Sequence, residues 1–168
     1  MPTASLLAYQ PHDHDRCVVR AMQRAQSLCD AKGARLTPMR KRVLELIWQS
    51  HQALGAYDLI AALLQEGSKA APPTVYRALE FLQETGLIHR IASLNAYIGC
   101  SVHKGPHMSC LMICKQCRNV QEKAHPELEQ LLLQPAVLGK FLPEQSVVEI
   151  TGLCPACQKA PIDCPTKD

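Results

Sequence analysis

The sequence predicts an α+β fold in two parts, a helical domain that ends in a β-hairpin and a small α/β domain that follows it. Apolar residues recur at helical spacing as far as Thr85, and beyond it short apolar runs bounded by turn residues accompany a leucine-rich helical stretch. The second part carries two Cys-x-x-Cys pairs, Cys114/Cys117 and Cys154/Cys157, with 36 residues between them. Helices first, then strands with a cysteine framework, are typical of two packed units rather than one.

Length and composition are those of a globular protein and argue against a membrane-spanning or secreted one. At 168 residues the chain suits one large domain or two small ones, and a hydrophobic content of 47% is enough for real cores. No apolar run approaches the roughly 18 residues of a membrane span. Residues 1–15 lack a basic region followed by an apolar one, which a secretory signal would have. We therefore expect a cytoplasmic protein that does not enter a membrane.

Charge is unevenly distributed along the chain. The net charge is +3, but residues 16–91 hold 11 Lys or Arg against 6 Asp or Glu, whereas residues 92–168 hold 7 of each. The first part is therefore the one suited to a polyanion such as DNA, although a solvated basic face has the same composition.

Apolar periodicity predicts four helices in the first part. In the first of them Cys29 falls on the apolar face, so we expect it in the core. The second begins at Thr37-Pro38, because a threonine hydroxyl caps a free N–H and proline has no N–H to leave unpaired. The four helices are predicted over 16–32, from Thr37 to about Trp48, over 56–65 and over 73–85.

Two short strands, 87–91 and 97–99, follow the fourth helix and flank a turn-like segment. Three or four helices followed by a hairpin are the order of a winged-helix DNA-binding domain, in which the helix before the wing lies in the major groove. Of the candidate DNA contacts, Arg77 could bond two acceptors of guanine and Tyr76 a thymine methyl or a phosphate. Thr74, with free N–H groups at the helix start, could hold a phosphate.

Arg40 is a further candidate, because it belongs to a basic cluster in the first turns of the second helix. For Tyr76 and Arg77 the alternative is an ordinary solvated face, and the helical pattern alone does not decide between the two.

The second part is predicted to be a small α/β unit. Strands are expected over 108–113, 119–123 and 146–151, and a leucine-rich helix over 126–134, which Pro135 interrupts. A unit of this size has little core of its own, so we expect both a metal staple and a homodimer to stabilise it.

The two cysteine pairs place four thiolates at the corners of a tetrahedron, which is the closed arrangement of a structural zinc site. A redox dithiol is the competing interpretation, but it needs only one pair. Two pairs flanking a small domain favour zinc, and an odd total of nine cysteines disfavours a disulfide framework.

A second group of possible metal ligands lies between residues 89 and 122, a stretch dense in His, Cys and Glu. No short regular spacing joins its members, and a lone histidine is more often an ordinary polar residue than a ligand. The group comprises His89, Cys100, His107 and Glu122, with His103 competing with His107, and Cys110 with Cys100. Because Cys110 lies in an apolar strand, we expect it in the core.

The stretches ARLTPMRKRVLELI, AYDLIAALL and PPTVYRALEFLQETGLIHRI resemble the Fur superfamily of metal-dependent repressors, and within it most closely the zinc uptake regulators. The resemblance runs from about Cys29 to Cys157. It implies a winged-helix domain, a hinge and a C-terminal dimerisation domain. We place these at 16–99, 100–106 and 107–158, between a mobile N-terminus at 1–15 and a tail at 159–168.

The resemblance also implies two Zn²⁺ per protomer. Structural zinc would lie on Cys114, Cys117, Cys154 and Cys157, and regulatory zinc at the hinge on His89, Cys100, His107 and Glu122. The segment from Cys100 to His107 is one residue shorter than in the familiar pattern. The seven-residue distance from His107 to Cys114 is kept, which favours His107 over His103.

The function implied is that of a zinc-responsive transcriptional repressor, which binds palindromic double-stranded DNA as a dimer and controls zinc uptake genes. A regulator that responds to iron, manganese or peroxide is the alternative. The His-His-x-Asp-His motif of iron sensors is absent where this chain has SVHKGPHMS, and a ligand set with a thiolate suits zinc better. Enzymes are the other class: a zinc hydrolase needs an open coordination position, and a dithiol oxidoreductase needs a free pair.

Overall fold

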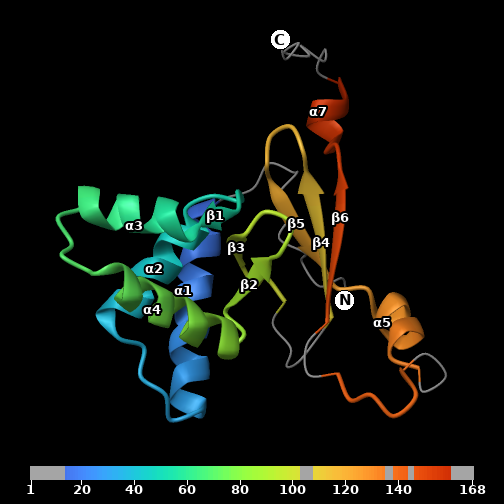
Figure 1. Ribbon diagram of the computed structural model, residues 1–168, viewed down its shortest axis with the longest axis horizontal. Helices are drawn as coiled ribbons and strands as arrows, with labels where there is room; N and C mark the ends of the chain where they lie inside the picture. Colours follow the sequence, from blue (N-terminus) through green and yellow to red (C-terminus); the bar gives the residue numbers. More distant parts are fainter. Residues whose placement is uncertain (1–13, 103–107, 135–137, 144–145, 160–168) are drawn as a thin grey trace.

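The computed structural model describes residues 14–102, 108–134, 138–143 and 146–159. Four helices form one half of the molecule, a three-stranded sheet forms the other, and the β-hairpin of the helical half lies between them (Figure 1). Among these described stretches, no helix is both long enough and apolar enough to span a membrane.

The helical half contains the four predicted helices, each with bounds within one turn of the expectation. Thr37 is the N-cap of the second helix, and its hydroxyl accepts a hydrogen bond from the N–H of Arg40. Leu44, Ile47 and Leu79 are fully buried between the helices, and Cys29 is fully buried as predicted. The helices are α1 (His14–Ala31), α2 (Pro38–Trp48), α3 (Ala56–Gln65) and α4 (Pro72–Glu84).

The predicted wing is present as two antiparallel strands, β2 (Ile88–Ile91) and β3 (Ala96–Gly99), and this order of helices and hairpin is that of a winged helix. A third strand, β1 (Leu54–Gly55), pairs with β3 and makes the sheet order β1-β3-β2. The sequence did not predict β1, because two residues are too few to carry a period. Asn95 closes the turn between β2 and β3 with a φ of +46°.

The second half is built on a sheet of order β5-β4-β6, in which β4 pairs antiparallel with β5 and parallel with β6. All three strands were predicted. The leucine-rich helix α5 buries no residue, and Leu131 is 56% exposed. The elements are β4 (Ser109–Cys114), β5 (Val120–Lys123), α5 (Pro126–Leu132), β6 (Val147–Gly152) and a short helix α7 (Pro155–Lys159).

A second apolar core joins the two halves. Ile91 and Ile98 of the wing pack against buried side chains of the C-terminal sheet, namely Leu111, Ile113 and Val120. The loop after α2 adds polar contacts. The N–H of Val120 donates to the carbonyl of His51 over 2.8 Å, and Gln52 forms an isolated bridge with Asn119. The halves are therefore in contact through packed side chains and backbone hydrogen bonds as well as through the polar cluster described next.

Candidate metal centres

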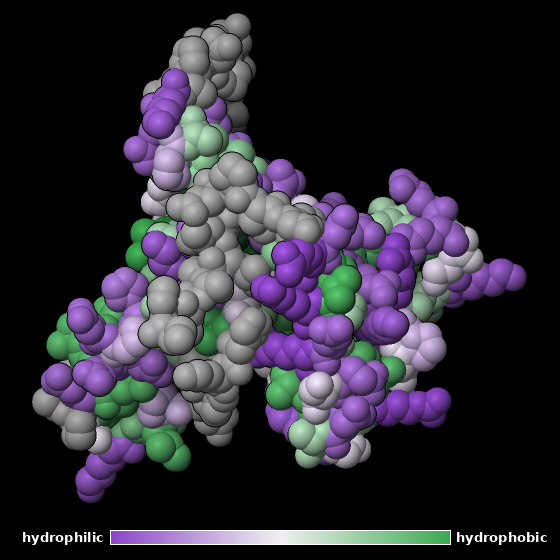
Figure 2. All heavy atoms as spheres, turned by 180° about the vertical axis from the view of Figure 1, so that it is seen from behind, coloured by the Kyte–Doolittle hydropathy of each residue, from purple (hydrophilic) through white to green (hydrophobic). Residues whose placement is uncertain are grey.

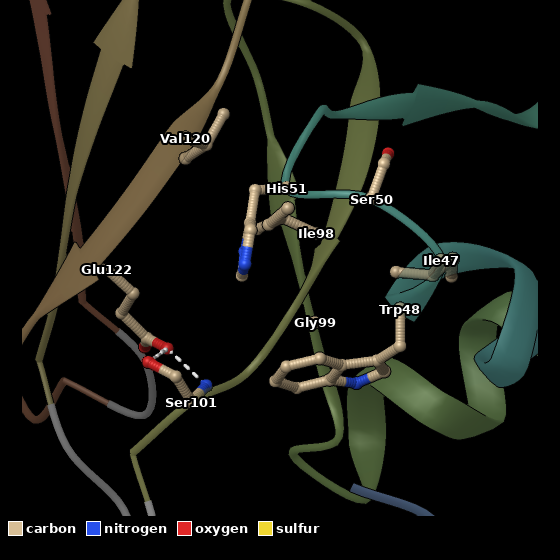
Figure 3. Close-up of a pocket in the computed structure, with 9 residues that line it drawn as sticks. All are labelled: Ile47, Trp48, Ser50, His51, Ile98, Gly99, Ser101, Val120 and Glu122. Atoms are coloured by element: carbon tan, nitrogen blue, oxygen red, sulfur yellow. Dashed lines mark hydrogen bonds between the residues drawn. The ribbon is translucent and has the colours of Figure 1, made fainter. Parts of the chain in front are cut away.

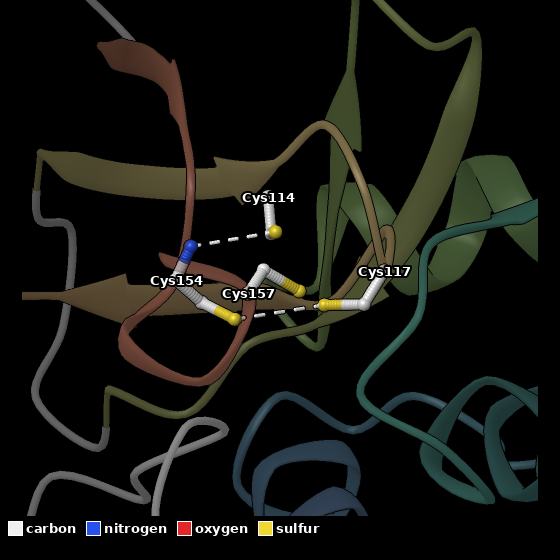
Figure 4. A group of neighbouring side chains, drawn as sticks. All are labelled: Cys114, Cys117, Cys154 and Cys157. Carbon is white, nitrogen blue, oxygen red and sulfur yellow. Dashed lines mark hydrogen bonds between the residues drawn. The ribbon is translucent and has the colours of Figure 1, made fainter. Parts of the chain in front are cut away.

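The four cysteines of the two Cys-x-x-Cys pairs meet at one end of the C-terminal sheet (Figure 4). Because β4 and β6 run parallel, with Cys114 opposite Gly152, both strands deliver their cysteine turns to the same end. The four sulfur atoms lie within 4.8 Å of one another. The Cys117 and Cys154 sulfurs are 3.8 Å apart, which is the spacing of corners in a tetrahedron with Zn–S bonds of about 2.3 Å.

The protonation of these thiols also fits a bound cation. Burial disfavours the thiolate of Cys114, but hydrogen bonds from backbone N–H groups, first that of Cys154 at 3.4 Å, outweigh it and lower its pKa to about 6. Contact with Cys154, then burial and the other two thiols, raise the pKa of Cys157 to about 12. Without a cation the cluster resists complete ionisation, since neighbouring thiolates repel one another. Four thiolates together therefore require a soft cation such as zinc.

A second cluster lies where the wing meets the sheet. His89 of β2, Cys100 just after β3 and Glu122 of β5 bring a ligand atom each to within 4.8 Å of the others. All three are buried, with exposed fractions of 5%, 2% and 4%. The antiparallel register of β2 and β3 places Cys100 opposite Leu87, so its side chain and that of His89 project from the same face of the wing. His107, the fourth predicted ligand, and its competitor His103 lie outside the described residues.

Hydrogen bonds hold Glu122 in this cluster. One carboxylate oxygen is 2.7 Å from His89 Nε2 and accepts from the Ser109 hydroxyl at 2.9 Å. The other accepts from the N–H and hydroxyl of Ser101, at 2.6 and 3.0 Å (Figure 3). Burial favours the neutral imidazole, but hydrogen bonds with Cys100 and Glu122 outweigh it and raise the pKa of His89 to about 9. A histidine, a cysteine and a carboxylate buried together form a set that a divalent cation would neutralise.

Sequence reasoning missed three polar residues around this cluster. Ser101 and Ser109 orient Glu122, and Arg24 of α1 donates to the carbonyl of Cys100 at 2.8 Å. Such side chains orient the ligands of metal sites. Nothing in the local sequence marks them, because each is brought to the cluster by the pairing of strands or the packing of α1.

A small pocket of about 20 Å³ lies beside this cluster, between the two halves. Trp48 and His51 line it from the helical half, and Ser101 and Glu122 are at its opposite side (Figure 3). Trp48 also lies against the backbone of Gly99, where an added Cβ would be 2.3 Å from Cε2 of the indole. The residue before Cys100 must therefore be glycine for α2 to pack this closely on the wing.

Three of the predicted DNA contacts lie on the outer face of α4. Thr74, Tyr76 and Arg77 are exposed. The start of α4 does not offer the free amides that the sequence predicted there: Pro72 has no N–H, nor has the proline after it, and the N–H of Thr74 bonds to the carbonyl of Ala71. Contacts of these three side chains with DNA stay a prediction.

Arg40 is in a different situation. Its guanidinium lies 3.4 Å from the centroid of the Phe81 ring and donates to the carbonyl of Arg35 at 2.6 Å. This side chain therefore already ties α2 to α4, and its contact with DNA also stays a prediction.

Comparison with known proteins agrees with this architecture. The chain is 38% identical over 137 residues to the zinc uptake regulation protein of Escherichia coli (strain K12), covering 81% of this chain and 80% of that protein. It is 31% identical over 138 residues to the ferric uptake regulation protein of Legionella pneumophila, covering 82% and 100%. The structure of a zinc uptake regulator complexed with zinc and DNA matches with a TM-score of 0.75 and 35% identity, over 88% of this chain and 97% of that one.

Residues 31–145 match the model of the ferric uptake regulator family. That match spans most of the chain, and it includes helices α2 to α5, the wing and the described members of the cluster at the hinge. The interpretations as a hydrolase or an oxidoreductase are thereby set aside, because the family is one of regulators. The chain belongs to the ferric uptake regulator (Fur) family.

Proposed function

We propose that this protein is a zinc-responsive transcriptional repressor, which binds palindromic operator DNA as a homodimer when zinc fills the hinge site and so controls zinc uptake genes. The observation that carries the proposal is the meeting of His89, Cys100 and Glu122, which come from both halves of the molecule and are all buried. A repressor acts on the chromosome, so the proposed location is the cytoplasm.

Two Zn²⁺ per protomer are part of the proposal. The structural ion would be held by Cys114, Cys117, Cys154 and Cys157, and the regulatory ion by His89, Cys100 and Glu122 with His107 as fourth ligand. A set that contains thiolate and imidazole suits zinc better than Fe(II) or Mn(II). The relative from Escherichia coli supports the same choice of metal, because it is a zinc uptake regulation protein.

The regulatory step follows from where the ligands originate. His89 and Cys100 belong to the wing, and Glu122 belongs to the C-terminal sheet. Only an arrangement in which the halves are closed on each other presents all of them together. Bound zinc would supply the positive charge that offsets the negative charges of the Cys100 thiolate and the Glu122 carboxylate. A ligand with a higher affinity for the closed arrangement raises its population.

In that closed arrangement α4 would present Thr74, Tyr76 and Arg77 to the major groove. Support comes from the exposure of this face and from the similar zinc uptake regulator that is complexed with DNA.

The homodimer is proposed from the apolar surface of the C-terminal half. Strand β6 lies at an edge of its sheet, and Ile150 on it is 50% exposed. Near α5, Leu131, Phe141 and Leu142 are 56%, 70% and 84% exposed, and Figure 2 shows apolar side chains on the surface of this lobe. A second copy of the chain would cover such a surface, and an exposed edge strand is a ready site for pairing.

The test is fluorescence anisotropy of a duplex selected from a random library, titrated against buffered free zinc, with parallel titrations of Fe(II) and Mn(II). We expect tight binding to a palindrome that appears with zinc and is lost in Cys100→Ser while the four-cysteine site keeps its metal. Binding that ignores zinc would contradict the regulatory role of the hinge. A response to iron alone would overturn the assignment to zinc.

A further inference from the structure

One row of residues crosses the C-terminal sheet from edge to edge. Leu111 of β4 lies opposite Glu122 of β5 on one side and opposite Glu149 of β6 on the other. Paired residues of neighbouring strands project from the same face of a sheet. Leu111 is fully buried against Ile91 and Ile98 of the wing, so this is the face that the wing covers. The row therefore presents one carboxylate to the wing at each edge of the sheet.

The carboxylate of Glu149 binds the wing directly. One oxygen accepts from the N–H of Ala92 at 2.6 Å, and the other accepts from the N–H of Ser93 at 3.2 Å. These two residues open the turn between β2 and β3, beyond the last pair of that ladder, Ile91 with Ala96. Their N–H groups are therefore not used in pairing β2 with β3. Although burial opposes it, hydrogen bonds from Ser93 and Ala92 lower the pKa of Glu149, so the group is a carboxylate at neutral pH.

We propose that Glu149 is a positioning residue for the wing, which seats the turn 92–95 on the C-terminal sheet without ligating metal and so favours the closed arrangement of the two halves. The inference rests on the proposed zinc-dependent binding of DNA. Contacts at one edge of the row, through Glu122, would leave the wing able to rotate about the apolar contact at Leu111. A second contact at the opposite edge fixes that rotation.

This role predicts a particular pattern of effects. Since Glu149 does not belong to either cluster of possible ligands, its removal shifts the equilibrium between open and closed arrangements and leaves the metal sites intact. A shifted equilibrium raises the zinc concentration needed to close the protein. Saturating zinc can still restore closure, so the DNA affinity at saturation changes much less. A residue needed only for folding would instead lower the amount of active protein.

The experiment compares Glu149→Ala with Glu149→Gln, which keeps one acceptor oxygen, and with Glu127→Ala, which removes an exposed acid from α5. DNA binding is measured by anisotropy against buffered zinc, and the zinc affinity of the hinge by competition with a chelator in the absence of DNA. We expect the zinc concentration at half-maximal DNA binding to rise roughly fivefold in Glu149→Ala, as for loss of a partly exposed charged hydrogen bond. The rise should be smaller in Glu149→Gln, and absent in Glu127→Ala.

A second variant removes the N–H of Ser93, which donates to Glu149, and leaves the Glu149 carboxylate in place. Ser93 follows Ala92 at the second position of a turn closed by the bond from Asn95 N–H to Ala92 carbonyl. Proline is favoured at that position and has no N–H, so Ser93→Pro should also raise the zinc requirement. If Glu149→Ala fails to fold, this variant decides the question. An unshifted zinc requirement in a folded variant overturns the inference, whereas a wild-type protein that ignores zinc overturns the proposed function first.

Discussion

Arg24 of α1 donates a hydrogen bond to the carbonyl oxygen of Cys100 over 2.8 Å, and both of its terminal nitrogens lie 3.8 Å from the Cys100 sulfur. Helix α1 thus reaches a proposed zinc ligand 76 residues later in the sequence. A guanidinium beside a sulfur favours the thiolate, which is the form that binds metal.

Replacing Arg24 should therefore weaken metal binding at the hinge. We expect Arg24→Ala to lower the zinc affinity of that site by about tenfold, the usual lower bound for losing a partner of a metal ligand. Chelator competition measures the affinity, and metal analysis checks that the four-cysteine site stays loaded. Arg20→Ala, which removes an exposed arginine from the same helix, is the control and should bind zinc as the wild type does. Equal affinities in the two variants would argue against a role for Arg24.

The pKa of His89 predicts how the stability of the protein with an empty hinge depends on pH. Contacts with Cys100 and Glu122 raise this pKa from 6.5 to about 9, so protonated His89 stabilises the folded state. The stabilisation is complete below about pH 6.5 and is lost as the pH rises through 9, a change on the order of 3 kcal/mol in the free energy of unfolding. Urea unfolding at pH 6.5 and 9.5 measures it. His89→Gln should flatten this dependence, and an unchanged slope would disprove the assignment.

Gly99→Ala tests the packing of α2 on the wing. The new Cβ would be 2.3 Å from the Trp48 ring, which cannot yield as a flexible chain would. We expect a loss of roughly 1–3 kcal/mol in the free energy of unfolding, typical of overpacking, together with weaker zinc binding because Cys100 is the next residue. Gly152→Ala is the matched control, since nothing lies within 4 Å of its added Cβ. Similar losses of stability in the two variants would mean that replacing a glycine destabilises the protein at either position, and that contact with Trp48 is not the cause.

Removal of Arg77 should weaken DNA binding, whereas removal of Arg40 should mainly lower the stability of the fold. Arg77→Ala is expected to weaken binding to the selected palindrome by about tenfold or more, as for loss of one bidentate base contact, and to leave stability unchanged. Arg40→Ala should mainly lower thermal stability, because it loses the contacts with Phe81 and the Arg35 carbonyl. Anisotropy and thermal unfolding on both variants separate the roles. If Arg40→Ala lost only DNA affinity, its intramolecular contacts would be incidental.

Features set by neighbouring residues were predictable from the sequence, and features set by strand register were not. The cap at Thr37 and the helices needed only local signals, and the structure confirms them. The meeting of His89 with Glu122 depends on how β2, β4 and β5 are placed, so the residues alone left it open and only the family resemblance pointed to it. Ser109 and Arg24 carry no signal at all, because their importance comes from what folding brings beside them.

The parallel pairing of β4 with β6 has a consequence for synthesis. Helices α1 to α4 are built from contacts between near neighbours in the chain, so they can assemble while later residues are still being added. The sulfur cluster cannot, since Cys114 must wait for Cys154 and Cys157, which come after the last strand. A nascent chain therefore forms its helical half before it can hold both metals, and a protein cut short before Cys154 would keep helices α1 to α4 but lack a closed site.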